Sequence, residues 1–274
     1  MSAATARLAR AIERARGEAR PLVIPYLTVG FPTLGETVDL AMAAAAAGVD
    51  ALELGLPFSD PLADGPVIQA ASQAALAGGV THERAFEIAR EVRRRSELPL
   101  LFMGYANPMY HYGLEKFIHV MSEAGVDGLI VPDLPHEEAG AAREAAGRAG
   151  VSWVPLIAPT TPTTRIPLLD AAATDFTYCV ALTGVTGVRA DLDPELPAYL
   201  ERVAGAVSRP FVVGFGISKP EQVARVAPPA AGVVIGSALI RAIGAATTPE
   251  ERRGAVTDFL APFRKQSRTG GSSC

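Results

Sequence analysis

Short apolar runs and amphipathic stretches alternate along the whole chain. Eight runs are rich in Val, Ile and Leu with little polar alternation, which is typical of parallel strands covered by helices on both sides. The strands are expected at residues 21–30, 50–57, 99–105, 127–134, 152–159, 176–182, 210–216 and 231–237. Helical patterns follow at residues 36–48, 81–95, 114–124, 137–150, 164–173, 196–207 and 219–227, and helical sequence continues after the eighth strand.

Eight strand–helix units with no linker between them favour one closed α/β barrel, the (β/α)8 or TIM barrel. The chain has 274 residues, and such barrels typically need about 250. An open doubly wound sheet is the alternative, but the sequence lacks the G-x-G-x-x-G motif of dinucleotide-binding sheets.

Two helices are expected in addition to the eight units. An amphipathic helix at residues 1–18 would cover the bottom of the barrel, and a short helix would follow the eighth strand. Residues 1–266 are then expected to form a single domain. The Gly/Ser-rich residues 267–274 are expected to form a flexible tail.

Composition excludes several classes of protein. Hydrophobic residues make up 49% and charged residues 20% of the chain, close to a globular average. A formal net charge of -4 argues against a nucleic-acid partner. Two cysteines, Cys179 and Cys274, cannot build a disulfide framework, which favours a reducing compartment such as the cytoplasm.

The sequence also argues against membrane insertion and export. The longest apolar run, residues 40–49, is too short to span a bilayer. The first residues contain arginines but no apolar segment of a secretory signal, and Glu13 and Glu18 argue against a transit peptide.

The second unit, LELGLPFSDPLADGPVIQ at residues 52–69, contains the strongest candidate for catalysis. Active sites of such barrels lie at the carboxyl ends of the strands. If Leu52 and Leu54 face the helices, the alternation of a strand turns Glu53 toward the barrel interior. Burial there would raise the carboxyl pKa toward neutrality, which suits proton transfer. A structural glutamate bonded to a neighbour is the alternative.

Two aspartates follow in the loop FSDPLADGP. Its two prolines and its glycine favour a shaped loop over a helix. Asp64, between Ala63 and Gly65, is placed to reach the pocket from a mobile lid. Turn or cap roles are the alternative for both Asp60 and Asp64. The residues alone thus favour a buried glutamate and a loop aspartate that move protons together.

Glycines gather at three consecutive strand ends late in the chain. They occur in TGVTG (183–187), GFGIS (214–218) and IGSALI (235–240). Glycines let backbone amides approach a ligand, and Ser237 lies where a helix begins, which favours an anion. Barrels often bind phosphate with the loops after the seventh and eighth strands. Ordinary tight turns are the alternative for each loop.

Other polar residues are weaker candidates. Tyr178 would face the pocket, while Cys179, of opposite parity, would lie in the core. Trp153 is expected to pack, and helix capping explains Asn107 and Asp133 as well as a functional role does. No metal site is predicted, because none of the histidines has ligand spacing: His82, His111, His119 and His136.

These motifs make the chain resemble the tryptophan synthase alpha subunit family over residues 15–265. The stretch PFSDPLADGP is the most specific of them. The segments that carry the resemblance are PYLTVGFP (25–32), LELGLPFSDPLADGPVIQ (52–69), GYANP (104–108), GLIVPDLP (128–135), TGVTG (183–187), GFGIS (214–218) and IGSA (235–238).

The resemblance implies a lyase of tryptophan biosynthesis that cleaves indole-3-glycerol phosphate to indole and glyceraldehyde 3-phosphate by a retro-aldol reaction. Glu53 matches the family's catalytic glutamate, which protonates the indole ring carbon and helps to remove the glycerol hydroxyl proton. Asp64 matches the aspartate that accepts the indole N–H.

The resemblance also implies binding positions. Thr186 matches a threonine of the lid over the substrate. The indole pocket is expected at Tyr26, Met103, Ile130, Tyr178 and Phe215. The phosphate site is expected at Gly187, Gly216, Gly236 and Ser237.

The implied partner is a pyridoxal-phosphate-dependent beta subunit, in an αββα complex that passes indole through a tunnel. No cofactor is expected in this chain. The stretch GLPFSDPL is unusually apolar for a loop. Leu56 and Phe58 are therefore expected either in an interface with the partner or packed inward on the barrel rim.

Three alternatives stay open at this point. They are a free-standing lyase that releases indole, a weakly active barrel that mainly activates a beta subunit, and another phosphate-binding barrel enzyme. The sequence departs from the usual family pattern at Ala181 and Leu182, which replace polar residues, and at Pro132. These departures affect the expected loop dynamics and pocket shape.

Overall fold

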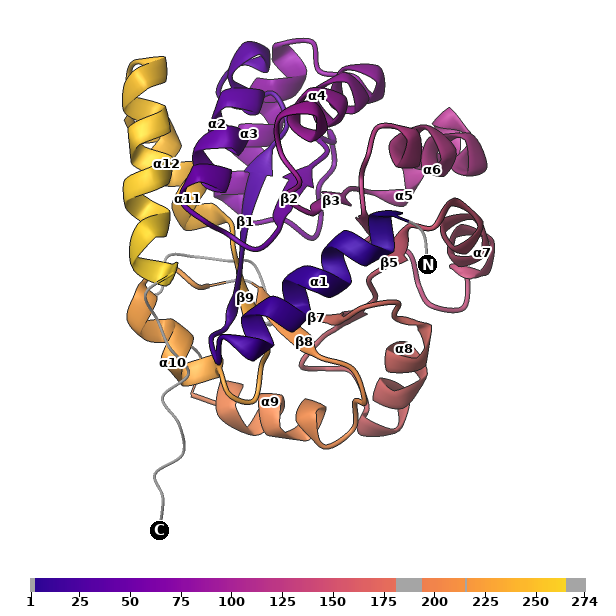
Figure 1. Cartoon of the computed structure of the whole chain (residues 1–274). Coiled ribbons are helices and arrows are strands. Elements are labelled where there is room, and N and C mark those ends of the chain that lie inside the picture. The colour runs from indigo at the N-terminus through magenta and orange to yellow at the C-terminus, as the bar shows by residue number, and fades with distance from the viewer. Residues whose placement is uncertain (1–2, 181–193, 215, 265–274) are drawn as a thin grey trace.

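The computed structural model describes residues 3–180, 194–214 and 216–264, and it shows strands surrounded by helices (Figure 1). The strands pair in the order β5-β4-β3-β2-β1-β9-β8-β7-β6, and every pairing is parallel. The expected closed α/β barrel is therefore confirmed. The tail at residues 267–274 lies outside the described residues.

The elements have the following bounds. The strands are β1 (Leu22–Thr28), β2 (Leu52–Gly55), β3 (Leu100–Met103), β4 (Gly128–Ile130), β5 (Ser152–Trp153), β6 (Leu156–Ile157), β7 (Thr177–Val180), β8 (Phe211–Gly214) and β9 (Gly232–Ile235). The helices are α1 (Ala3–Gly17), α2 (Thr37–Ala46), α3 (Pro66–Ala77), α4 (His82–Arg95), α5 (Ala106–Tyr112), α6 (Leu114–Glu123), α7 (Gly140–Ala149), α8 (Ile166–Ala172), α9 (Leu196–Ala204), α10 (Val223–Val226), α11 (Ser237–Ala245) and α12 (Pro249–Arg264).

The fifth strand of the barrel is divided in two, where the sequence predicts one strand at residues 152–159. β5 pairs with β4, and β6 pairs with β7. Between them, Val154 N–H donates to the Leu129 carbonyl at 3.1 Å, and the Pro155 carbonyl accepts from Tyr178 N–H at 3.0 Å. Pro155 itself has no N–H for a strand ladder, which explains the division. β5 and β6 follow each other directly along the chain and pair with β4 and β7, so together they close the barrel.

Two helices, α3 and α5, are absent from the sequence prediction. α3 follows the loop after β2, which holds Asp64, and α5 follows β3. α3 begins at Pro66, directly after the loop with Asp64, and a proline suits the first turn of a helix. α5 begins directly after Tyr105. The short helix expected after the eighth strand is α11, which begins at Ser237.

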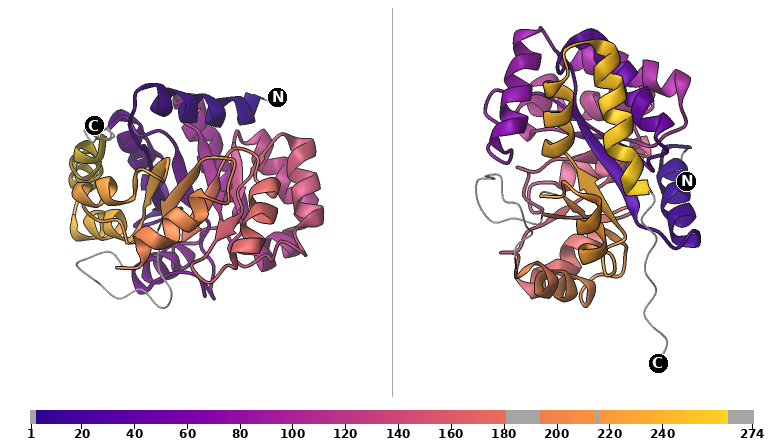
Figure 2. Two further views of the ribbon diagram at one scale, coloured as in Figure 1. Left: turned by 90° about the horizontal axis from the view of Figure 1, so that it is seen from below. Right: turned by 90° about the vertical axis from the view of Figure 1, so that its left-hand side faces the viewer.

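Helix α1 lies across one end of the barrel (Figure 2). Its side chains Leu8, Ala11 and Ala15 are buried. Ion pairs join it to Asp50 and Asp127, which stand immediately before β2 and β4. α1 therefore covers the amino-terminal ends of these strands, opposite to the end that carries the candidate site.

The buried residues form a hydrophobic core that includes the strands and the inner faces of the surrounding helices. Cys179 is fully buried in it, and burial raises the pKa of its thiol to about 12. Among the described residues, no helix is both long and apolar enough to cross a bilayer.

Candidate active site

Glu53 lies in the middle of β2 and is turned toward the barrel interior. It pairs in register with Tyr26 of β1 on one side and with Leu101 of β3 on the other. The residue is only 1% exposed. Its Oε2 atom is buried and has no hydrogen-bond partner within the described part of the chain. A buried carboxyl oxygen without a partner is costly, and such a group is often functional.

Two tyrosines lie beside Glu53 and are held in the same way. A Cβ atom built at Gly55 would lie 2.0 Å from the Tyr26 hydroxyl, and one at Gly214 would lie 1.9 Å from the Tyr178 hydroxyl. Each phenol therefore occupies the space above a glycine on the neighbouring strand, two residues beyond its register partner. Only glycine leaves room for these rings, so each ring lies over the end of the neighbouring strand.

The surroundings of Glu53 favour its protonated form. Burial, and then the negative charge of Asp64, raise the pKa of the Glu53 carboxyl to about 8. The same two carboxylates, together with burial, raise the pKa of the Tyr26 and Tyr178 hydroxyls. Glu53 is therefore a carboxylic acid at neutral pH and able to donate a proton.

Asp64 is held in place by Tyr105, which follows β3. The Tyr105 hydroxyl donates to Asp64 Oδ2 at 3.0 Å and accepts from the Ala63 N–H at 3.1 Å. The ring of Phe58 packs on the Tyr105 ring with centroids 5.2 Å apart. Gln69 donates to the Asp64 carbonyl at 2.9 Å. The loop that was expected as a mobile lid is thus tied to the barrel at Asp64 and Ala63.

Burial raises the pKa of Asp64 to about 6, although the hydrogen bond from Tyr105 lowers it. At neutral pH, Asp64 is mostly a carboxylate while Glu53 keeps its proton. Two neighbouring acids whose pKa values are pushed apart divide the roles of proton donor and charge stabiliser between them. The sequence analysis missed Tyr105, although GYANP places it at a strand end, where functional residues gather.

The other expected pocket residues that the structure describes lie at the same end of the barrel. Met103 and Ile130 are buried register partners at the ends of β3 and β4. Gly236 caps the N-terminus of α11, and Ser237 is its first residue. Gly216 has a φ of +85°, a conformation that favours glycine. The remaining expected residues lie outside the described ranges: Thr186, Gly187 and Phe215.

The apolar residues of the Asp64 loop divide between the core and solvent. Leu56 is buried, as expected for inward packing, whereas Phe58 packs on Tyr105 but stays half-buried, so the choice between inward packing and an interface remains a prediction for Phe58. Leu62 is instead 94% exposed, next to the acid loop. On α5, Tyr110 is 49% exposed. These two side chains, and not Leu56 or Phe58, are the exposed apolar groups of this region.

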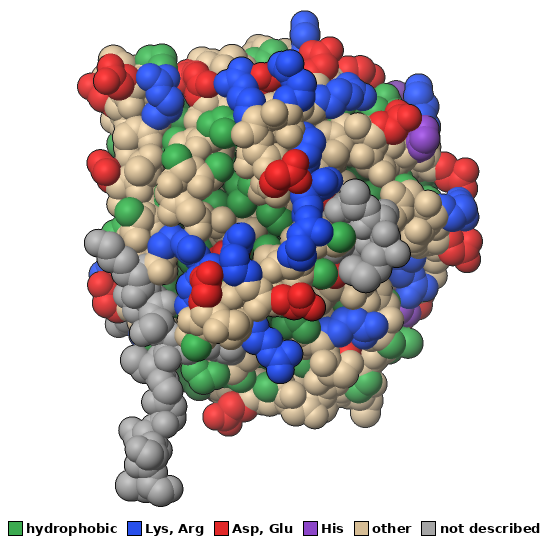
Figure 3. Space-filling view, in the orientation of Figure 1, with side chains coloured by type: hydrophobic (Ala, Val, Ile, Leu, Met, Phe, Trp, Pro, Cys, Tyr) green, Lys and Arg blue, Asp and Glu red, His purple; other side chains and the backbone are tan. Residues whose placement is uncertain are grey.

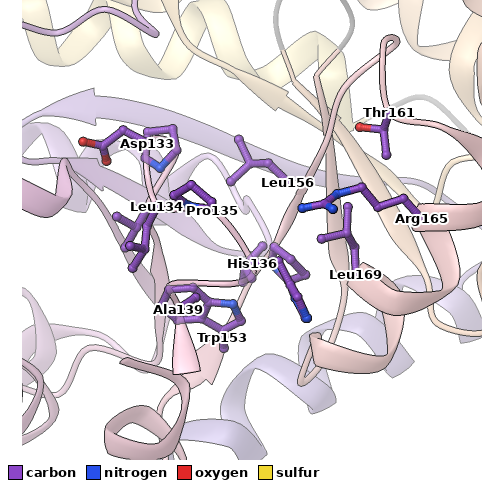
Figure 4. A pocket seen from close by; sticks show the side chains of 14 residues that line it. Asp133, Leu134, Pro135, His136, Ala139, Trp153, Leu156, Thr161, Arg165 and Leu169 are labelled. Carbon is purple, nitrogen blue, oxygen red and sulfur yellow. The ribbon is translucent and has the colours of Figure 1, made fainter. Parts of the chain in front are cut away.

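A separate cavity of about 250 Å³ lies beside the loop after β4 (Figure 4). Trp153, Leu156 and Leu169 form much of its wall, which agrees with a packing role for Trp153. Asp133 accepts a hydrogen bond at 2.9 Å from the N–H of Ala106, the first residue of α5, and so caps that helix. The lining of this cavity does not include Glu53 or Asp64.

Comparisons with known proteins show the family of the chain. The family model for the tryptophan synthase alpha chain matches residues 12–267. The chain is 46% identical to the tryptophan synthase alpha chain of Roseiflexus sp. (strain RS-1), over 94% of this chain and 99% of the relative. It is 44% identical to that of Geobacillus kaustophilus, over 89% and 92% of the two chains.

Solved structures show the same likeness. A chain of the Mycobacterium tuberculosis tryptophan synthase matches with a TM-score of 0.87 and 30% identity, over 96% of this chain and 99% of that one. A chain of the tryptophan synthase α2β2 complex of Pyrococcus furiosus matches with a TM-score of 0.83 and 38% identity, over 89% and 97%. The chain belongs to the tryptophan synthase alpha chain family, whose members are lyases of tryptophan biosynthesis.

Proposed function

We propose that this chain cleaves indole-3-glycerol phosphate to indole and glyceraldehyde 3-phosphate, with Glu53 and Asp64 as its catalytic residues. One observation carries the assignment: a fully buried glutamate with a pKa of about 8 stands within the electrostatic reach of an aspartate with a pKa of about 6. This pair supplies a proton and a negative charge in the same pocket at neutral pH.

In the first step, the Glu53 carboxylic acid donates its proton to the indole ring carbon that bears the glycerol chain. The ring becomes a cation whose N–H faces Asp64. The Asp64 carboxylate accepts a hydrogen bond from that N–H and stabilises the positive charge. A charge that is stabilised as it develops lowers the barrier more than uniform binding of the substrate does.

In the second step, the Glu53 carboxylate takes the proton of the glycerol hydroxyl next to the ring. The carbon–carbon bond to the ring breaks, its electron pair restores the neutral indole, and the former alcohol carbon becomes the aldehyde. Glu53 ends protonated, as it began, so the atoms and charges balance. No cofactor takes part in these steps, and pyridoxal phosphate belongs to the beta subunit of the family.

The positions that bind the substrate are proposed from the resemblance to the family. The indole ring is held by Tyr26, Met103, Ile130, Tyr178 and Phe215 under the lid residue Thr186. The phosphate is held by backbone amides at Gly187, Gly216, Gly236 and Ser237. The position of Ser237 at the N-terminus of α11 supports this, because such an end attracts anions. Gly236→Asp is expected to abolish binding of phosphate-bearing ligands and to leave indole binding intact.

A lyase assay on indole-3-glycerol phosphate with the purified chain tests the function. The unmodified chain is expected to release indole. Glu53→Gln is expected to lower turnover by about 10²–10⁴-fold, the usual contribution of general acid–base catalysis. Near-normal turnover in that variant would refute the role of Glu53. An inactive unmodified chain that still raises the rate of a beta subunit would support a purely activating role.

We propose a beta subunit as the partner, in an αββα complex in the cytoplasm. The exposed side chains of Leu62 and Tyr110 support an interface with such a partner. The α2β2 assembly of the P. furiosus enzyme, described as mutually activating, supports it too. Leu62 is 94% exposed beside the loop of Asp64, so a partner that covers it would also act on that loop. Titration with a cognate beta subunit is expected to raise the lyase rate. Leu62→Ser, which removes the exposed apolar group and adds no charge near Asp64, is expected to weaken the rise and to leave the rate of the chain alone unchanged.

A further inference from the structure

A second cavity, of about 550 Å³, lies at the opposite end of the barrel, beneath α1. Its walls come from α1, from the end of α2, from the residues before β3 and from Arg264 at the end of α12. Pro99, which lines it, immediately precedes β3, so the cavity opens on the amino-terminal side of the strands. Its lining contains none of the residues assigned to the proposed reaction. The size falls in the range of small-molecule sites.

Arginines dominate the polar lining of this cavity. Arg7, Arg10 and Arg14 are spaced three and four residues apart on α1, which places them on one face of the helix. Arg264 faces them from α12. In Figure 3, several blue side chains lie on the face of the molecule that α1 crosses, with red side chains between them. Of the described residues in the lining, two are acidic, Glu18 and Glu97.

The carboxylates under the cavity neutralise these arginines only in part. Asp50 is fully buried and already receives two hydrogen bonds from Arg20, at 2.7 and 2.8 Å, and one from the Val23 N–H at 3.0 Å. Arg14 approaches Asp50 only to 3.4 Å, and Arg264 to 3.4–3.5 Å. One carboxylate is therefore shared by three guanidinium groups.

Guanidinium groups also outnumber carboxylates at the other end of α1. Asp127 is shared by Arg7, at 2.8 Å, and Arg93, at 2.7 Å. Glu97 reaches Arg7 only at 3.7 Å. Within the described ranges, Arg10 forms no ion pair and is exposed. Among the described residues named here, six arginines in and next to the cavity thus share four carboxylates, and two positive charges remain. The arginines are Arg7, Arg10, Arg14, Arg20, Arg93 and Arg264, and the carboxylates are Glu18, Asp50, Glu97 and Asp127.

We propose that this cavity is a binding site for a small polyanion of the phosphate type, such as a diphosphate or a metabolite with two phosphate groups. Guanidinium groups match phosphate oxygens in a two-pronged geometry and are suited to desolvated anion sites. Arg7 and Arg14 stand seven residues apart, about 10 Å along the helix, which is longer than one phosphate. A ligand there bridges α1, the residues before β3 and α12, and so stabilises the closure of α1 on the barrel.

Calorimetric titration of the full chain with inorganic pyrophosphate at low ionic strength tests this site. The double variant Arg10→Gln/Arg14→Gln is expected to weaken binding at least tenfold. The matched control Arg84→Gln/Arg94→Gln removes the same charge from exposed positions of α4 and is expected to change binding less than twofold. Both variants alter exposed side chains, and circular dichroism checks that they fold.

The variant Gly236→Asp distinguishes binding at this cavity from binding at the proposed phosphate site of the reaction. It is expected to keep pyrophosphate binding at the cavity. Pyrophosphate is also expected to raise the melting temperature of the unmodified chain and not that of the α1 double variant, whose lyase rate stays unchanged. The proposal is overturned by an absence of pyrophosphate binding, by equal weakening in both double variants, or by loss of binding confined to Gly236→Asp.

Discussion

The hydroxyl of Tyr105 donates a 3.0 Å hydrogen bond to the carboxylate of Asp64, across the gap between the end of β3 and the loop after β2. The same oxygen accepts from the backbone N–H of Ala63. One phenol therefore fixes both the side chain and the backbone of the loop. A loop acid acts on a developing charge only when it is held in position, so Tyr105 is a positioning residue for Asp64.

Tyr105→Phe keeps the packing on Phe58 and removes both hydrogen bonds. Because the bond from Tyr105 lowers the pKa of Asp64, its loss is expected to raise that pKa above about 6. The acid side of the pH–rate profile should then move to higher pH, and kcat should fall about tenfold, the order expected for one hydrogen bond to a charged group. Tyr110→Phe, at an exposed tyrosine of α5, is the control. An unchanged profile in Tyr105→Phe would show that the bond has no catalytic role.

The two acids predict a bell-shaped dependence of the lyase rate on pH. The proposed reaction needs Asp64 ionised and Glu53 protonated, so the rate is expected to fall below about pH 6 and above about pH 8. The apparent values belong to the coupled pair. Since the charge of Asp64 helps to raise the Glu53 pKa, Asp64→Asn should lower turnover and move the basic limb of the residual activity to lower pH. A basic limb that stays in place would contradict this coupling.

Glu53 is expected to destabilise the folded chain at neutral pH. Its pKa is about 8 when folded, against 4.5 for an ordinary glutamate. Below pH 4.5 the carboxyl is protonated in both states and costs nothing. As pH rises from 4.5 to 8 only the unfolded chain ionises, and folding loses about 3–5 kcal/mol.

Glu53→Gln removes this titration. The variant is therefore expected to gain stability relative to the unmodified chain as pH rises from 4 to 8. Urea unfolding at both pH values measures the difference, and Glu123→Gln, at an exposed glutamate, is the control. A difference between Glu53→Gln and the unmodified chain that does not depend on pH would refute the raised pKa.

Gly214→Ala is expected to damage the pocket because its Cβ atom would lie 1.9 Å from the Tyr178 hydroxyl. The ring must move, at a cost of about 1–3 kcal/mol in stability, and KM should rise. Gly147→Ala, in α7, meets no atom within 4 Å and is expected to stabilise the chain by about 0.5–1 kcal/mol. Thermal unfolding and steady-state kinetics compare the two. Equal effects of the two substitutions would mean that Tyr178 does not depend on Gly214.

The strands and the inward orientation of Glu53 follow from the sequence because they depend on local patterns. Apolar runs and the alternation of a strand determine which side chain faces the interior. Pro155 divides the fifth strand for a local reason too, yet the surrounding apolar residues suggest an unbroken run. α3 was missed because it follows the Pro/Gly loop directly, and α5 because Pro108 lies within its first turn.

The contacts that complete the site could not be predicted in this way. The bond from Tyr105 to Asp64 joins residues 41 positions apart, and no periodicity encodes it. The loop around Leu56, Phe58 and Leu62 has no repeating geometry, so its apolar residues do not reveal which of them faces solvent. The arginines of α1 follow a helical spacing, but their shared carboxylates come from distant strand ends.

Tyr26 lies over Gly55, and Tyr178 lies over Gly214. This placement restricts the two glycine positions to glycine but leaves the two tyrosine positions open to smaller side chains. The glycines are fixed, because any side chain there would meet a ring. The rings can be shortened, because the backbone that each hydroxyl approaches is that of a glycine, Gly55 or Gly214. Trimming either tyrosine would deepen the pocket beside Glu53 without moving the backbone. If indole binds beside these rings as proposed, replacing Tyr26 or Tyr178 with a smaller residue is expected to widen the range of ring-substituted indoles that the lyase cleaves.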